Sequence, residues 1–182
     1  MKLKRLVSYV FTALVILVPI SPARASFLDG QTVQTTYLFP NTSTVFAGPV
    51  NSVVGPGVEL LSFAGFANID FSDTNIRITT TRNAALNNVA FDGFRFTDIS
   101  GTISAITSVT LNPATNYAGF DSTRVTFDAN NVFVNVANLA GLQGQVISLD
   151  LSTAAAVPEP SALGLIAIGS GFLGWRLRRS RS

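Results

Sequence analysis

Apolar and polar residues alternate through much of the interior of this 182-residue chain. Residues 75–81 read Asn-Ile-Arg-Ile-Thr-Thr-Thr, and stretches of the same kind recur at 94–96, 132–136 and 146–151. Gly, Asn, Asp and Pro separate these stretches. A period of two bounded by turn residues is typical of half-buried antiparallel strands. Within residues 26–157, no apolar stripe of helical spacing is longer than about three turns, so no substantial helix is expected there.

These strands predict an all-β fold, a single antiparallel β-sandwich that is jelly-roll-like in size and covers residues 26–153. The chain has 14 phenylalanines, and most are expected in the core of the sandwich, where their burial replaces the stabilisation that disulfides give to smaller secreted folds. The leading core candidates are Phe63, Phe66, Phe71, Phe91, Phe94, Phe96, Phe127 and Phe133. Residues 48–57 contain two prolines and three glycines and are expected to form a surface loop.

Composition excludes several classes of function. The chain has no cysteine and no histidine, and residues 26–157 contain no lysine. Disulfides, Ser-His-Asp or Cys-His nucleophiles and the common zinc sites are therefore excluded. The same residues hold four arginines against nine carboxylates, a net charge of −5. A nucleic-acid partner is not expected, because binding phosphates needs a concentrated positive face.

The N-terminus has the three parts of a secretory signal peptide, so an N-terminal signal helix is expected in addition to the sandwich. Residues 1–25 begin with basic side chains, continue through an uncharged, mostly apolar stretch at 6–20, and end with small residues at Ala23 and Ala25. Cleavage is expected between Ala25 and Ser26, so the secretion translocon and signal peptidase are expected partners. A permanent anchor is the alternative, but the apolar stretch is short for a membrane span and contains proline near its end.

The C-terminal end combines three elements in a fixed order. A Pro158-Glu159-Pro160 box, flanked by Val157 and Ser161, closes a linker at 154–161. An apolar stretch at 162–175 follows, with a length that is marginal for crossing a bilayer. The tail at 176–182 is basic through Arg176, Arg178, Arg179 and Arg181. Clustered arginines resist translocation, so the tail is expected to stay cytoplasmic while the sandwich lies outside.

This order resembles a PEP-CTERM sorting signal, which would here occupy residues 154–182. The resemblance implies a Gram-negative exported protein whose tail is recognised by an exosortase-type membrane protease near Pro158 to Pro160. The apolar stretch would then be a transmembrane helix that anchors the protein only transiently in the inner membrane, before the ectodomain reaches the cell surface or an extracellular matrix. Two alternatives remain open: an ordinary anchor that is never cut, and a dimerisation face built from small residues in the apolar stretch.

Asp70, Asp73 and Asn75 form a D-x-x-D-x-N cluster that is expected at the edge of a loop. Hard oxygen ligands on a turn suit Ca²⁺, although the spacing is not that of an EF-hand. Acidic residues that cap strand ends are the commoner explanation of such a cluster. Ca²⁺ is the ion that this cluster would suit, and no other cofactor is predicted.

Tyr37 and Tyr117 are the two amphipathic aromatic residues between the terminal signals. Exposed tyrosines can stack on sugar rings, so both are candidate glycan contacts and an extracellular polysaccharide is a candidate partner. The alternative is that both pack in strands. Glu59, the single glutamate of this region, is the candidate for a carboxylate-dependent polysaccharide hydrolase; pairing with a nearby arginine is the alternative.

The sequence thus predicts an exported, exosortase-processed surface or extracellular-matrix protein, associated with exopolysaccharide or biofilm, that has no catalytic activity. A glycan-binding, lectin-like surface module, assisted by Ca²⁺ at Asp70 and Asp73, is the first alternative. A polysaccharide hydrolase built around Glu59 is the second.

Overall fold

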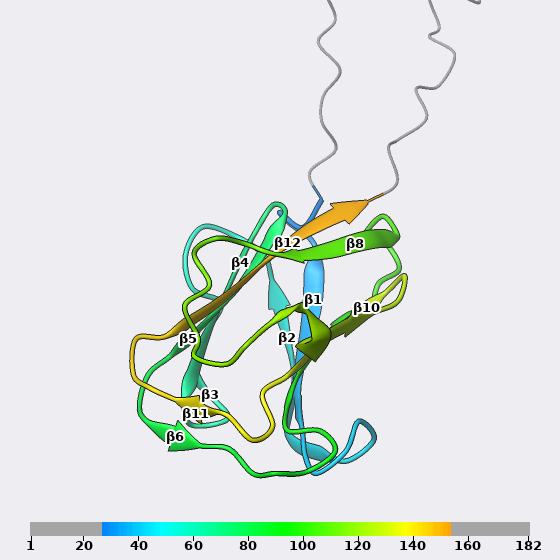
Figure 1. Ribbon diagram of the computed structural model, residues 1–182. Helices are drawn as coiled ribbons and strands as arrows, with labels where there is room; N and C mark the ends of the chain where they lie inside the picture. The colour runs from blue at the N-terminus through cyan, green and yellow to red at the C-terminus, as the bar shows by residue number, and fades with distance from the viewer. Residues whose placement is uncertain (1–26, 154–182) are drawn as a thin grey trace, which may run out of the picture.

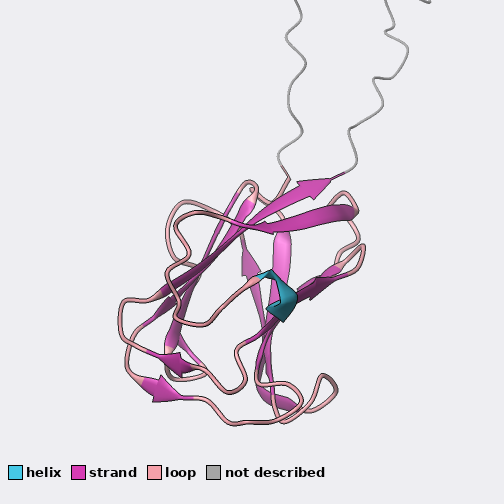
Figure 2. Ribbon diagram, viewed as in Figure 1, coloured by secondary structure: helices cyan, strands magenta, loops and turns pink. Residues whose placement is uncertain are grey.

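The computed structural model describes residues 27–153, which form two five-stranded antiparallel sheets and a small third sheet (Figures 1 and 2). The first sheet has the order β2 (Val45–Val53), β1 (Thr32–Leu38), β7 (Gly93–Asp98), β10 (Asn131–Asn135) and β9 (Val125–Phe127). The second has the order β3 (Leu60–Phe63), β4 (Ala67–Ser72), β5 (Asn75–Thr80), β12 (Val146–Thr153) and β8 (Ile106–Leu111). The third pairs β6 (Ala84–Ala85) with β11 (Ala140–Gly141).

The predicted all-β antiparallel fold is confirmed. Within residues 27–153 the helical content is a single short 3₁₀ turn, η1 (Ser122–Arg124). None of the helices in this range is long and apolar enough to cross a membrane. The predicted signal peptide, the Ala23, Ala25 and Ser26 cleavage region and the predicted transmembrane helix at 162–175 lie outside the described residues.

Aromatic rings from both sheets meet in the core between them. Phe94 of β7 contacts Tyr37 of β1 and Phe66, with ring centroids 4.9 and 5.9 Å apart. Phe71 of β4 packs edge-on against Phe96 of β7 at 5.5 Å. Edge-to-face contacts of this kind add to the burial energy of the rings. The buried members of the predicted phenylalanine set are Phe63, Phe66, Phe71, Phe91, Phe94 and Phe96.

The prediction that Phe127 and Phe133 belong to the buried core is wrong. Phe127 lies on the edge strand β9 and is 42% exposed, because no further strand covers that side of the sheet. Phe133 lies between Val132 and Val134, whose side chains are buried in the core. Since neighbouring residues of a strand point to opposite faces, Phe133 lies on the outer face of the first sheet. There its ring meets that of Phe91 at 6.3 Å.

The expected loop at 48–57 is also corrected, because residues 48–53 belong to β2. Proline cannot donate to a sheet ladder and is confined to edge strands, and β2 is the edge strand of the first sheet. Pro49 is tolerated there, next to an irregularity in the register of β1 and β2. Only the residues after Val53 form the expected connection to β3.

Both ends of the described chain lie at the same end of the sandwich (Figure 1). The amide of Leu28 donates to the carbonyl oxygen of Asp73 at 3.0 Å. The amide of Leu151 donates to the carbonyl oxygen of Thr74 at 2.8 Å. One turn, between β4 and β5, therefore holds the beginning and the end of the described domain together.

Candidate functional site

Two residues of the predicted calcium cluster, Asp73 and Asn75, have separate hydrogen-bond roles. Asp73 lies at the β4–β5 turn, where its Oδ1 accepts a hydrogen bond from the amide of Phe27 at 2.5 Å. The side-chain amide of Asn75 donates to Asp150 Oδ1 at 2.8 Å and to Ser148 Oγ at 3.0 Å, both on β12. These bonds hold the side chain of Asn75 on the outer face of the second sheet, next to Asp150, with which Asn75 pairs in register.

Asp70 and Asp73 do share one feature, since both border an open depression of about 690 Å³ at the end of the sandwich where the chain enters and leaves. Burial, together with the negative charge of Glu59, raises the pKa of Asp70, while Arg77 on the neighbouring strand opposes the shift. Within residues 27–153, no group of three or more acidic side chains is arranged to hold a metal ion. The calcium site therefore stays a prediction without structural support.

Glu59 is tied to the backbone rather than to an arginine. Its Oε1 accepts from the amide of Gly55 at 3.0 Å, and its Oε2 accepts from the amide of Phe71 at 2.8 Å. Glu59 thus fastens the connection between β2 and β3 onto β4. Most other carboxylates of the described domain also accept hydrogen bonds from nearby groups of the fold: Asp73, Asp92, Asp98, Asp121, Asp128 and Asp150.

Tyr37 and Tyr117 are buried, with 3% and 5% of their surfaces exposed. The expectation of a solvent-facing pair of tyrosine rings is therefore corrected. The Tyr37 hydroxyl donates to Asp92 Oδ1 at 2.6 Å. Burial, and then this hydrogen bond, raise the pKa of Tyr37 far above its ordinary value, so the hydroxyl keeps its proton. Burial also raises the pKa of Tyr117 to about 12, and its hydroxyl has no hydrogen-bond partner among the described residues.

The outer face of the first sheet carries two adjacent rows of side chains, which we call the polar face. Cross-strand pairing places Thr36, Arg95, Phe133 and Thr126 in one row, of which Thr36 is fully buried. The same pairing places Asn51, Gln34, Thr97 and Asn131 in the next row. Hydrogen bonds hold the second row in place, from Gln34 to Asn51 at 3.0 Å and from Thr97 to Asn131 at 2.8 Å.

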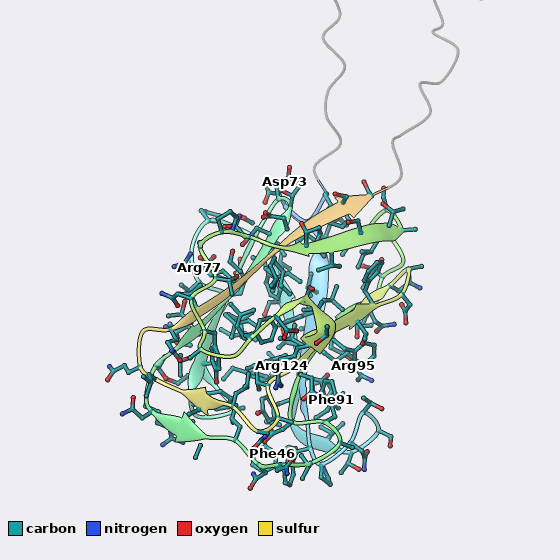
Figure 3. All side chains as sticks on the ribbon, viewed as in Figure 1. Phe46, Asp73, Arg77, Phe91, Arg95 and Arg124 are labelled. Atoms are coloured by element: carbon teal, nitrogen blue, oxygen red, sulfur yellow. The ribbon has the colours of Figure 1, made fainter. Side chains whose placement is uncertain are left out.

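Arg95 is the least satisfied polar group of the polar face. Its Nη2 donates to Thr36 Oγ1 over a long 3.5 Å, and its buried Nε has no hydrogen-bond partner in the described part of the chain. The other central arginine labelled in Figure 3, Arg124, is engaged with the carbonyl oxygen of Ala137 at 2.9 Å. Arg95 is therefore a partly buried cationic group that pairs in register with the partly buried Phe133 and has one buried donor without a partner among the described residues.

A second concave site, the distal pocket, lies at the opposite end of the molecule from the chain ends. It has a volume of about 190 Å³ and is lined by Tyr37, Phe39, Phe46, Ala64, Phe66, Leu86, Asn87 and Asp92. Figure 3 shows Phe46, which lines it, at the end of the sandwich away from Asp73. Asp92 is buried, and its Oδ2 accepts from the amide of Asn87 at 3.0 Å. The pocket therefore combines aromatic rings with one carboxylate.

The alternation of apolar and polar residues along β7 predicts that Arg95 lies on the outer face of the first sheet. Arg95 stands between two buried phenylalanines, Phe94 and Phe96, so its side chain had to leave the core on the opposite face. The neighbouring position of Phe133 depends on pairing between β7 and β10, which is not a local property. For the distal pocket no local signal existed, because Tyr37 and Asp92 are 55 residues apart.

The structure thus defines a β-sandwich with a polar sheet face and an aromatic pocket, and comparison with known families adds its sorting class. Residues 156–180 match the PEP-CTERM protein-sorting motif. The chain therefore carries a PEP-CTERM sorting motif at its C-terminal end, and this motif implies an exported protein targeted to an exosortase. The matched residues include Val157 to Ser161 and Arg176, Arg178 and Arg179, all outside the described residues. No match was found among curated proteins or among solved structures.

Proposed function

We propose that this protein is cut by an exosortase and then acts, without catalysis, as a surface or extracellular-matrix component of an exopolysaccharide-producing Gram-negative bacterium. The sorting motif at residues 156–180 carries this proposal. The ectodomain would be held transiently at the inner membrane, outside the cytoplasm, and released from its tail near Pro158 to Pro160.

The hydrogen bonding of the carboxylates supports a role without catalysis. A glycosidase needs two carboxyl groups that face each other across a cleft and remain available to substrate. Glu59, the sequence candidate for such a role, has both oxygens bonded to backbone amides. Asp98, Asp121 and Asp128 cap local turns in the same way. Carboxylates with these roles stabilise loops, and their removal would be expected to cost stability rather than turnover.

Processing is tested by the mass and location of the mature protein from its native host. We expect a mass that lacks residues 1–25 and the tail beyond the Pro158–Pro160 box. The double variant Pro158→Ala/Pro160→Ala should accumulate as an unprocessed, membrane-bound form. Pro113→Ala, in an exposed turn of the ectodomain, is the matched control and should be processed normally. A mature protein that keeps residues 161–182 in the membrane fraction would show an ordinary anchor instead.

The polar face favours glycan binding as a second candidate function. Flat arrays of amides and hydroxyls can bond sugar hydroxyls, and the Phe133 ring offers an apolar surface to a sugar. Arg95 adds a preference for carboxylate groups, because its planar fork matches a carboxylate in charge and shape. We infer that an acidic polysaccharide is the ligand class that the polar face fits best.

Retention of the mature protein on immobilised polygalacturonate, compared with neutral dextran, tests this second function. Arg95→Gln should weaken binding to polygalacturonate at least about tenfold, since a hydrogen bond to a charged group contributes about 1.5–3 kcal/mol. Arg82→Gln removes an exposed arginine from a loop outside the polar face and should bind as the parent does. Equal losses in both variants would indicate general charge attraction and would remove Arg95 from the proposal.

A further inference from the structure

The distal pocket contains a carboxylate in surroundings that are otherwise largely aromatic and aliphatic. Asp92 directly precedes β7, and its backbone is held on both sides by β10 and the residue after it. The amide of Asp92 donates to Asn135 Oδ1 at 3.2 Å, and its carbonyl oxygen accepts from the amide of Val136 at 2.8 Å. Two backbone contacts therefore fix the position of Asp92 in the chain beside the pocket.

Each oxygen of the Asp92 carboxylate accepts one hydrogen bond from a neighbouring group of the fold. The Tyr37 hydroxyl donates to Oδ1 at 2.6 Å, and the amide of Asn87 donates to Oδ2 at 3.0 Å. A carboxylate can accept about four hydrogen bonds, so each oxygen keeps capacity for a further contact. Apart from the exposed side-chain amide of Asn87, the lining offers a ligand ring surfaces and carboxylate oxygens rather than donors.

No arginine of the described residues is hydrogen-bonded to this carboxylate. Arg124 donates to the carbonyl oxygens of Ala137 and Asn135, and Arg95 donates to Thr36. A buried charge is costly unless a charge of opposite sign compensates it. A cation that enters the pocket would supply that compensation.

Aromatic rings form much of the lining of the pocket. Phe46 is 65% exposed, and its ring centroid lies 6.2 Å from that of Phe39 and 6.0 Å from that of Tyr37. Phe66 meets Tyr37 edge-on at 5.5 Å. Ring faces attract cations, and rings grouped around an acidic residue are a recognised way to bind quaternary ammonium groups. A sugar would need both donors and acceptors, which this lining supplies unequally.

We propose that the distal pocket binds an organic ammonium group, with Asp92 as its counter-ion and Phe39, Phe46 and Phe66 as the surrounding rings. The site is separate from the polar face and does not depend on glycan binding there. It lies at the end of the sandwich away from both ends of the described domain (Figure 3). The same group can come from a free solute or from a lipid headgroup.

Calorimetric titration of the protein isolated from its native host tests the proposal. Choline is the probe, and 3,3-dimethylbutan-1-ol is its neutral control of equal shape. Choline should bind saturably with a millimolar or lower Kd, and the neutral control at least about tenfold more weakly, because it lacks the charge that Asp92 attracts. Equal binding of the two, binding of neutral monosaccharides in place of choline, or no heat of binding would overturn the proposal.

Two variants locate the binding. Asp92→Asn keeps an acceptor for Tyr37 but removes the charge, and should weaken choline binding at least about tenfold. Phe46→Ala removes an exposed ring, so the fold is expected to survive and choline binding to fall several-fold. Phe127→Ala, which removes an exposed ring on β9, should leave the Kd unchanged. Unchanged affinity in Phe46→Ala would overturn the site. Cosedimentation with phosphatidylcholine vesicles would assign the headgroup as the source, and its absence a free solute.

Discussion

Gly93→Ala is expected to destabilise the domain by about 3 kcal/mol or more, at the severe end of what overpacking costs. Gly93 begins β7, which lies between β1 and β10 in the first sheet. A Cβ atom at this position would lie 2.0 Å from the carbonyl oxygen of Val134 and 3.2 Å from the Cα of Asn135. Both are backbone atoms, so a change of rotamer cannot relieve the clash and the two strands must separate.

Urea unfolding of residues 26–157 measures this effect, with Gly55→Ala as the matched control. Gly55 has no heavy atom within 4 Å of an added Cβ and does not need a left-handed backbone. Its alanine variant should be neutral or more stable by up to about 1 kcal/mol, because alanine lowers the entropy of the unfolded chain. If Gly93→Ala unfolds at the same urea concentration as Gly55→Ala, the pairing of β7 with β10 at this position is wrong.

Phe94→Ala is expected to cost about 3–5 kcal/mol, a large part of the 5–15 kcal/mol by which natural domains are usually stable. Phe94 is 1% exposed and lies at the centre of the aromatic core. Its ring centroid is 4.9 Å from Tyr37, 5.9 Å from Phe66 and 6.1 Å from Phe96. Truncation would leave a cavity between two rigid sheets, which can close only partly.

Phe127→Ala is the control for this loss, because it removes the same side chain from an edge strand where 42% of its surface is exposed. We expect a cost of about 1 kcal/mol or less there. Thermal unfolding of both variants decides between the predicted and the observed core. Equal losses would mean that the ring of Phe127 is as deeply packed as that of Phe94, as alternation alone had suggested.

Alternation along single strands could be predicted, and pairing between distant strands could not. The period of two at residues 75–80 and 94–96 correctly predicted that these residues form strands and which side chains of each strand are buried. At Val132-Phe133-Val134 all three residues are apolar, so the pattern does not say which face is buried. The structure decides it through Val132 and Val134, which enter the core and leave Phe133 outside.

The candidate sites likewise depend on contacts between distant segments, which the sequence did not predict. Asp70, Asp73 and Asn75 are close in sequence, but Asn75 is bonded to Asp150 of β12, 75 residues away. Asp92 and Tyr37 give no sign in sequence that they meet, because their contact depends on the loop before β7 folding against β1. The sorting motif is the opposite case. Its order along the chain is the whole signal, so it could be recognised without any knowledge of the fold.

The place of β12 has a consequence for the timing of export. β12 pairs with β5 on one side and β8 on the other, so it is an interior strand of the second sheet. It is also the last strand of the domain and comes shortly before the Pro158–Pro160 box. A chain that crosses the membrane from its N-terminus keeps β5 and β8 unjoined until residue 153 has emerged. On the proposed route of export, completion of the fold coincides with arrival of the sorting motif at the membrane, so the ectodomain would close as its tail reaches the exosortase.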